Sequence, residues 1–293
     1  MDAAIKLTNL DAGFERKVVV EQINTTIFAG TIAAIAGPNG AGKSTLLHLL
    51  LNHFRSDSGR CEIAGVDARK LCPKDLQKIG YVAENRHLPE WMTVAQFFRY
   101  TSQFYPGWRA EELQELTGQF RLPVNTKLSA LSRGKRMQVA LAATLAYRPQ
   151  IILLDEPFTG LDVLVRDQLI ESILDRSADS TVLLASHDLA EIESFATHFS
   201  YLNEGRLQFS GEMHQLQMAF REVEVVLREA VEIEVPAHWL NYSSQGEMVR
   251  FTDSKHAGVD EIRDRFQGAA DITVHNLPLR SIFVELAKQG QKR

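Results

Sequence analysis

Cysteine is nearly absent from the 293-residue chain, which contains only Cys61 and Cys72. Neither residue lies in a paired spacing with further ligands, so the sequence predicts neither a disulfide framework nor a zinc site. Two ordinary reduced cysteines are typical of a cytosolic protein.

Long apolar runs are missing as well. The longest, at residues 32–36, 46–51 and 151–154, fall far below the roughly 20 residues that span a bilayer. The N-terminus MDAAIKLTNL has an acid at Asp2 and no basic-then-apolar run, so no secretory signal is expected. We therefore expect a soluble chain.

The chain also lacks an excess of positive charge, with 32 Lys and Arg against 37 Asp and Glu and a net charge of -5. Proteins that wrap nucleic acid usually show a basic excess, so we expect no nucleic-acid partner. The hydrophobic fraction of 45% is enough for a substantial core. The length predicts one main domain plus an appendage.

The N-terminal pattern predicts strands and then a glycine loop. Residues 4–10 and 23–28 alternate as antiparallel strands with one wet face. Residues 31–36 form a buried strand, followed by the loop 37–42 and a helix from Lys43. Strand, glycine loop and helix in this order indicate a nucleotide-binding α/β fold.

The rest of the chain divides into a helical insert, further buried strands and an appendage. Apolar spacing predicts the insert at about residues 85–148 and buried strands at 151–154 and 181–185. After Gly211 we expect strands at 222–228, 231–235 and 247–252 and helices near 258–266 and 280–288. The predicted domains are thus 1–211 and a small α/β domain at 212–293.

The loop GPNGAGKS matches the phosphate-loop pattern in its required context, after a buried strand and before a helix. Its glycines let backbone N–H groups and the helix N-terminus face an anion. Lys43 would reach the β- and γ-phosphates, and Ser44 would hold Mg²⁺. We expect the nucleotide to be bound by Gly37, Pro38, Asn39, Gly40, Ala41, Gly42, Lys43, Ser44 and Thr45.

The run IILLDEP supplies two acids at the end of a second buried strand. Unpaired carboxylates are costly to bury, so this pattern favours a function over packing. Asp155 would bind Mg²⁺ through a water, and Glu156 would polarise the attacking water.

The order of these motifs resembles the ATP-binding cassette ATPases over about residues 5–220. The likeness extends to Phe14, placed where the family stacks an aromatic ring on adenine, and to GYVAEN at 80–85, in place of the glutamine loop. LSRGK at 131–135 occupies the position of the family signature LSGGQ. TGLD at 159–162 resembles the loop that orders the interface, through Asp162. SHD at 186–188 contains His187, which matches the family's switch histidine.

Two departures from the family pattern stand out. Glu84 replaces the glutamine that contacts Mg²⁺ and the attacking water; a carboxylate also suits this cation. Arg133 and Lys135 replace a glycine and the glutamine of the signature, while Ser132 and Gly134 remain. Two interpretations of the added cations stay open: they help to hold the nucleotide, or they are solvated surface residues.

The resemblance implies a P-loop core with a mixed sheet and flanking helices, an antiparallel β subdomain and a helical signature subdomain. It implies ATP and Mg²⁺ as ligands, with Glu156, His187, Lys43 and Glu84 as catalytic residues and Ser44, Glu84 and Asp155 at the metal. It also implies a head-to-tail homodimer in which Ser132 and Gly134 complete the partner's site. A separate transmembrane permease would hold the chain at the inner face of the cell membrane.

Other functions fit the sequence less well. A soluble member of the same ATPase group, acting in DNA repair or translation, would usually carry long coiled-coil, zinc-binding or second-cassette insertions. A GTPase would need an Asn-Lys-x-Asp string, which does not occur, and a helicase would need more length and basic surface. A regulatory ATP binder without activity is disfavoured by the intact Glu156 and His187.

Export is the favoured direction of transport. The YVAE loop and the terminal LPLRSIFVELAK resemble the corresponding segments of bacterial drug, antibiotic-peptide or polysaccharide exporters. The substrate is not predicted.

Overall fold

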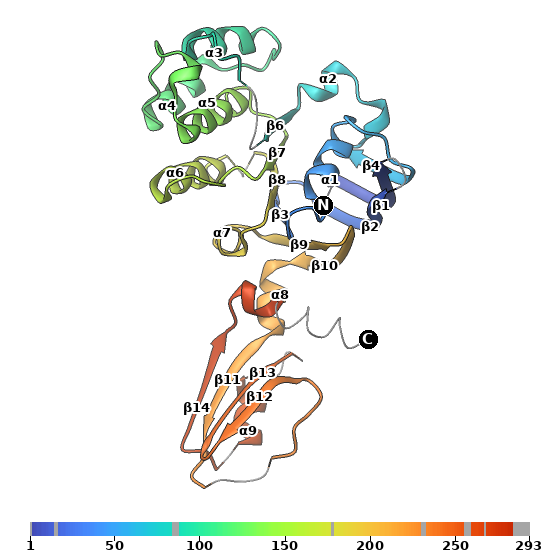
Figure 1. The fold of residues 1–293 in the computed structure, drawn as a ribbon, viewed down its shortest axis with the longest axis vertical. Coiled ribbons are helices and arrows are strands. Elements are labelled where there is room, and N and C mark those ends of the chain that lie inside the picture. Colours follow the sequence, from blue (N-terminus) through green and yellow to red (C-terminus); the bar gives the residue numbers. More distant parts are fainter. Residues whose placement is uncertain are drawn as a thin grey trace. The chain divides into compact units, whose positions relative to one another are not determined.

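The computed structural model describes residues 2–14, 17–83, 88–176, 179–229, 233–254, 259–266 and 268–283. The chain forms two compact units (Figure 1). The first unit comprises residues 1–188 and 195–210, and the second comprises residues 189–194 and 211–293.

An antiparallel sheet opens the first unit. Its strand order is β2 (Lys17–Phe28), β1 (Ala3–Phe14), β4 (Ser58–Ile63) and β5 (Val66–Asp67). Ile5 and Leu7 of β1 enter the core with the predicted period of two, and Leu10 enters it after a register shift between Leu7 and Leu10.

A six-stranded sheet forms the centre of the first unit. Its order is β10 (Arg206–Glu212), β9 (His198–Asn203), β3 (Ile32–Ala36), β8 (Thr181–Ser186), β7 (Ile151–Asp155) and β6 (Ile79–Ala83). The strands from β9 to β6 run parallel, and β3, β7 and β8 are buried throughout. The predicted α/β class with a mixed set of sheets and a P-loop core is confirmed.

The register of the parallel strands positions the site. Ala36 lies opposite Ser186, and Asp155 lies opposite Ala185. The carboxyl ends of β3, β8 and β7 therefore meet at one edge of the sheet, where ligands bind in such folds. Helix α1 (Lys43–Leu50) follows β3, and α6 (Val163–Leu174) follows β7.

Short helices and turns fill the segments between these strands. They are η1 (Ala68–Lys70), α2 (Pro73–Leu76), α3 (Val94–Ser102), α4 (Ala110–Gln119), η2 (Leu128–Ala130) and α5 (Arg133–Leu145). Thr93 and Gln96 form a capping box at the start of α3, and the Ser132 hydroxyl caps α5. Among the helices of the described residues, none is long and apolar enough to cross a bilayer.

The second unit has its own sheet and core. It contains α7 (Leu189–Glu193), α8 (Met213–Ala219) and α9 (Val259–Arg265), and its sheet has the order β12 (Trp239–Gln245), β13 (Met248–Asp253), β11 (Arg221–Val226) and β14 (Asp271–Asn276). Trp239 stacks on Phe251 with the ring centroids 3.8 Å apart, and both pack with Val223, Val225 and Phe266.

The structure differs in part from the prediction for this unit. A strand was expected at 231–235, but residues 233–235 belong to no strand, and 231–232 lie outside the described residues. Strands β12 and β14 were not predicted. Of the expected terminal helix, residues 280–283 are helical and the remainder lies outside the described part of the chain.

Candidate active site

The phosphate loop connects β3 to α1 and is shaped by its glycines. Gly42, the residue before α1, has φ 107°, a conformation that L-residues with a side chain rarely adopt. A side chain on Gly37 would put its Cβ 2.0 Å from the Leu202 carbonyl oxygen. Pro38, Asn39 and Gly40 are exposed at the loop tip, so a ligand can reach the loop.

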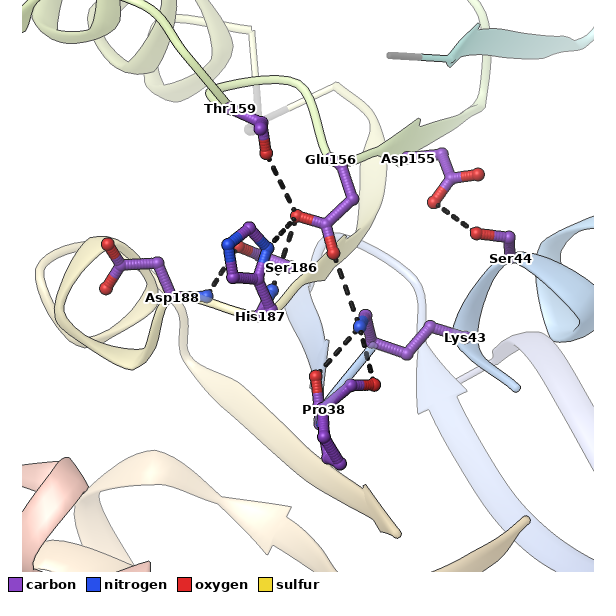
Figure 2. Close-up of polar contacts among 10 residues, drawn as sticks. Pro38, Lys43, Ser44, Asp155, Glu156, Thr159, Ser186, His187 and Asp188 are labelled. Carbon is purple, nitrogen blue, oxygen red and sulfur yellow. Dashed lines mark hydrogen bonds and ion pairs between the residues drawn. The ribbon is translucent and has the colours of Figure 1, made fainter. Parts of the chain in front are cut away.

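Lys43 is buried, with 5% of its surface exposed, and its ammonium group closes over the phosphate loop (Figure 2). Its Nζ donates to the carbonyl oxygens of Gly37, at 2.8 Å, and Pro38, at 3.2 Å. It also forms an ion pair with Glu156 Oε1 at 3.3 Å. The ammonium therefore occupies the side of the loop where phosphate oxygens could replace the two carbonyls.

Ser44 and Asp155 meet across the ends of α1 and β7. The Ser44 hydroxyl donates to Asp155 Oδ1 at 2.9 Å. Burial raises the pKa of Asp155, as does the Glu156 carboxylate, while the Ser44 hydrogen bond and the charges of His48 and Lys43 oppose this. A hydroxyl and a carboxylate side by side are hard oxygen ligands that suit Mg²⁺.

Glu156 is the centre of the polar network in Figure 2. Its backbone has φ 49°, an uncommon left-handed conformation that clusters at functional sites. The side chain is 11% exposed, and its Oε2 accepts from the Thr159 hydroxyl at 3.2 Å and the His187 backbone N–H at 3.3 Å. The His187 Nδ1 lies 2.7 Å from the same oxygen.

His187 follows β8 and turns towards Glu156. The Ser186 hydroxyl accepts from the Asp188 backbone N–H at 3.1 Å, which fixes the chain just after the histidine. The structure thus brings together Lys43, Ser44, Asp155, Glu156 and His187. The contacts of Thr159 and Ser186 were not predicted, although the spacing of three residues from Glu156 to Thr159 suits a turn contact.

The signature residues are not part of this cluster. Ser132 is exposed, and its hydroxyl accepts from the Lys135 backbone N–H at 3.3 Å. Gly134 faces Leu161 and Val165 of the following segment. In Figure 1, α5 lies apart from α1. Within one chain, Ser132 and Gly134 therefore do not join the phosphate loop.

Two predicted residues cannot be placed. Glu84 lies outside the described residues, so its predicted contacts with Mg²⁺ and water stay predictions. Phe14 ends β1 opposite Lys17, but its side chain is not described, and adenine stacking also stays a prediction.

Comparison with known proteins identifies the family. Residues 20–159 match the family described as "ABC transporter". The ABC transporter ATP-binding protein YtrB of Bacillus subtilis is 30% identical, over 77% of this chain and 80% of YtrB. The chain belongs to the ABC transporter ATP-binding proteins.

Further relatives agree with this assignment. The Fe(3+) ions import ATP-binding protein FbpC of Pseudomonas fluorescens is 32% identical, over 76% of this chain and 66% of FbpC. A solved ATP-binding subunit of an ABC transporter has TM-score 0.68 and 25% identity, covering 73% of this chain and 92% of that one. A bacterial Atm1-family ABC exporter with ATP bound has TM-score 0.65 and 26% identity, over 73% of this chain and 39% of the exporter. As an ABC ATPase, the chain binds and hydrolyses ATP.

The two signature departures have different surroundings in this ABC ATPase. Lys135 Nζ donates to the Phe120 carbonyl oxygen at the end of α4. Burial lowers the pKa of Lys135, as does Arg121, while Asp162 opposes them. Arg133 lies over the TGLD loop, where a Cβ on Gly160 would come 2.9 Å from the Arg133 Nη1. Lys135 thus binds a carbonyl of its own subdomain rather than standing free in solvent.

Proposed function

We propose that this chain energises a transporter by hydrolysing ATP at the cluster around Glu156. The observation that carries the proposal is the set of contacts on one carboxylate: Thr159, His187 and Lys43 all hold Glu156, beside the Ser44–Asp155 pair. A carboxylate fixed in this way can accept a proton from an attacking water.

Each residue has a role that its position suits. The N-terminus of α1 and the Lys43 ammonium bind and neutralise the phosphates. Ser44 and Asp155 would hold Mg²⁺, which supplies further charge neutralisation when bound. His187 lies within hydrogen-bond distance of Glu156 and so would orient this base, and it would also contact the γ-phosphate.

We also propose a head-to-tail dimer. Ser132 and Gly134 cannot serve the phosphate loop of their own chain from the position they occupy, so a second copy would receive them. Val163 and Leu164, just after the TGLD loop, are 59% and 76% exposed. Solvent-exposed apolar side chains beside a functional loop are typical of a protein–protein interface.

The membrane partner would dock on the helical part of the first unit. Tyr100 and Phe104 form an edge-to-face pair with ring centroids 5.1 Å apart, and both are about half exposed. Trp91, at the start of the same segment, is 71% exposed. These rings suit a permease surface at the inner face of the cell membrane. Export stays a prediction, because the relatives include importers and a structural neighbour is an exporter.

The direct test of the reaction is Glu156→Gln. We expect it to retain ATP binding and to lower kcat by on the order of 10² to 10⁴, because the amide cannot accept the proton. Glu171→Gln, which changes an exposed acid of α6, is the matched control and should keep wild-type turnover. Unchanged turnover of Glu156→Gln at saturating Mg·ATP would show that another group is the base.

A further inference from the structure

Among the described residues, strand β14 is an edge of the sheet in the second unit. It pairs with β11 in a continuous antiparallel register, from Arg221 opposite Asn276 to Val226 opposite Asp271. Within the described residues it has no second neighbour in the sheet (Figure 1). The opposite edge, β12, is different, because its register shifts between Leu240 and Ser243 and Asn241 has φ 50°. Irregularities of this kind discourage pairing, and β14 has none.

The hydrogen bonds of β11 fix which peptide groups of β14 point outwards. Leu227 N–H donates to the Glu247 carbonyl at 2.7 Å, and these residues continue the register of β11 with β13. Odd-numbered residues of β11 therefore bond to β13, and even-numbered residues bond to β14. It follows that the N–H and C=O groups facing away from the sheet are those of Ile272, Val274 and Asn276.

On the core face of the sheet, the side chains of β14 are apolar and remain partly exposed to solvent. Ile272 and Val274 lie opposite Val225 and Val223, which are fully buried in the core of the unit. Ile272 and Val274 themselves are only partly buried. A neighbouring strand would cover both and satisfy the outward peptide groups at the same time.

We propose that β14 pairs antiparallel with β14 of a second copy of this chain, about a two-fold axis at Thr273. Opposed residues must lie on the same face of a sheet, so each pairs with a residue of the same parity. About this axis Ile272 lies opposite the partner's Val274 and exchanges hydrogen bonds with it. Thr273 lies opposite the partner's Thr273, in a pair without hydrogen bonds.

The pairing of Asp271 with His275 selects this register over those with the axis at Ile272 or Val274. Asp271 lies opposite the partner's His275. The two-fold axis generates a second, identical pair, so the interface contains two carboxylate–imidazole pairs. Both are non-hydrogen-bonded pairs, in which the side chains approach most closely. Moving the axis to Ile272 or Val274 would set Asp271 against Thr273 or Leu277 and lose both pairs. Asp271 now accepts from its own Ile272 N–H at 2.9 Å, a contact that the partner strand would replace.

Cysteine cross-linking tests the pairing and its register. In a Cys72→Ser background the remaining thiol is Cys61, which is buried and whose pKa is raised to about 12 by burial, so it stays unreactive. Thr273→Cys should then form a disulfide-linked dimer at least about tenfold faster than Ser243→Cys on the β12 edge, because opposed Cβ atoms are close enough for the bond.

Two variants within β14 make the register falsifiable. His275→Cys alone should not cross-link, because its two copies would lie about 13 Å apart along the strands. The double variant Asp271→Cys/His275→Cys should cross-link as Thr273→Cys does. Equal rates for Thr273→Cys and Ser243→Cys, or rapid cross-linking of His275→Cys alone, would overturn the proposal.

Substitutions that change the charges of Asp271 and His275 test the same contact without placing a cysteine at either position. In the Thr273→Cys background, His275→Asp should slow cross-linking several-fold, because it opposes two carboxylates. Adding Asp271→Lys should restore the rate. Loss of the rate without restoration would overturn the proposed register. The reaction needs no nucleotide, so its result is independent of the proposed ATPase site, and circular dichroism of each variant verifies its fold.

Discussion

Asp155 is the buried last residue of β7, and burial of its charge lowers the free energy of unfolding. Burial raises its pKa, and the adjacent Glu156 carboxylate adds to the effect. The folded chain therefore holds the Asp155 proton more tightly than the unfolded chain does. Ionised Asp155 lowers the stability of the chain when nucleotide is absent.

Asp155→Asn should therefore stabilise the nucleotide-free protein while abolishing turnover. The rise in Tm should be full at neutral pH, where Asp155 is ionised, and should disappear as the pH falls below the pKa of the folded state. Thermal unfolding across this range, paired with an ATPase assay, measures both effects. A lower Tm for Asp155→Asn at neutral pH would contradict the argument.

Lys135 offers a second prediction at the scale of one residue. Because its ammonium binds the Phe120 carbonyl, Lys135→Met should lower the free energy of unfolding by about 1 kcal/mol, the value of one hydrogen bond. The KM for ATP should stay unchanged. A large rise in KM without loss of stability would instead place Lys135 at the nucleotide.

At the scale of elements, a buried ion-pair network joins three helices. Glu112 of α4 is 6% exposed and accepts from Arg148, after α5, at 2.7 Å and from Arg176, after α6, at 2.8 Å. Burial alone would raise the pKa of Glu112, but the two guanidinium groups outweigh it and lower the pKa. The ion pairs of Glu112 with Arg148 and Arg176 therefore hold the helical subdomain against α6.

Glu112→Ala should destabilise the chain by about 2 kcal/mol, because Arg176 loses its buried partner while the more exposed Arg148 is resolvated. A lowered pKa means that this stabilisation is present above the unfolded pKa and is lost as the pH falls through the folded one. Denaturant unfolding should show a smaller difference in free energy of unfolding between the wild type and Glu112→Ala at acidic pH than at neutral pH. The same loss at both pH values would contradict an ionic origin.

Local signals explain which elements could be predicted. The phosphate loop and the acids of β7 were found because each motif lies within a few residues of a buried strand. Strands β12 and β14 were missed: β14 contains only Ile272 and Val274 as alternating apolar residues, and β12 is polar and bulged. The contact of Lys43 with Glu156 depends on the segments after β3 and β7 being brought together by the fold, which no local pattern contains.

For the whole molecule, the central claim is that a second copy completes the nucleotide site. Ser132 and Gly134 lie in the helical subdomain and Lys43 lies in the phosphate loop, so in the proposed dimer each chain would supply two half-sites. A ligand that binds only the closed pair stabilises that pair by mass action. Ser132→Arg should abolish the pair and the ATPase activity while leaving nucleotide binding by the monomer intact.

The decisive measurement is light scattering on Glu156→Gln with and without Mg·ATP. His275→Asp is included to weaken β14 pairing, so that this pairing contributes less to the mass. We predict a largely monomeric protein without nucleotide, since two chains of net charge -5 repel weakly, and a dimer with Mg·ATP. A mass that stays monomeric with Mg·ATP at micromolar concentrations, while the His275→Asp protein with Glu156 intact is fully active at the same dilution, would contradict the account.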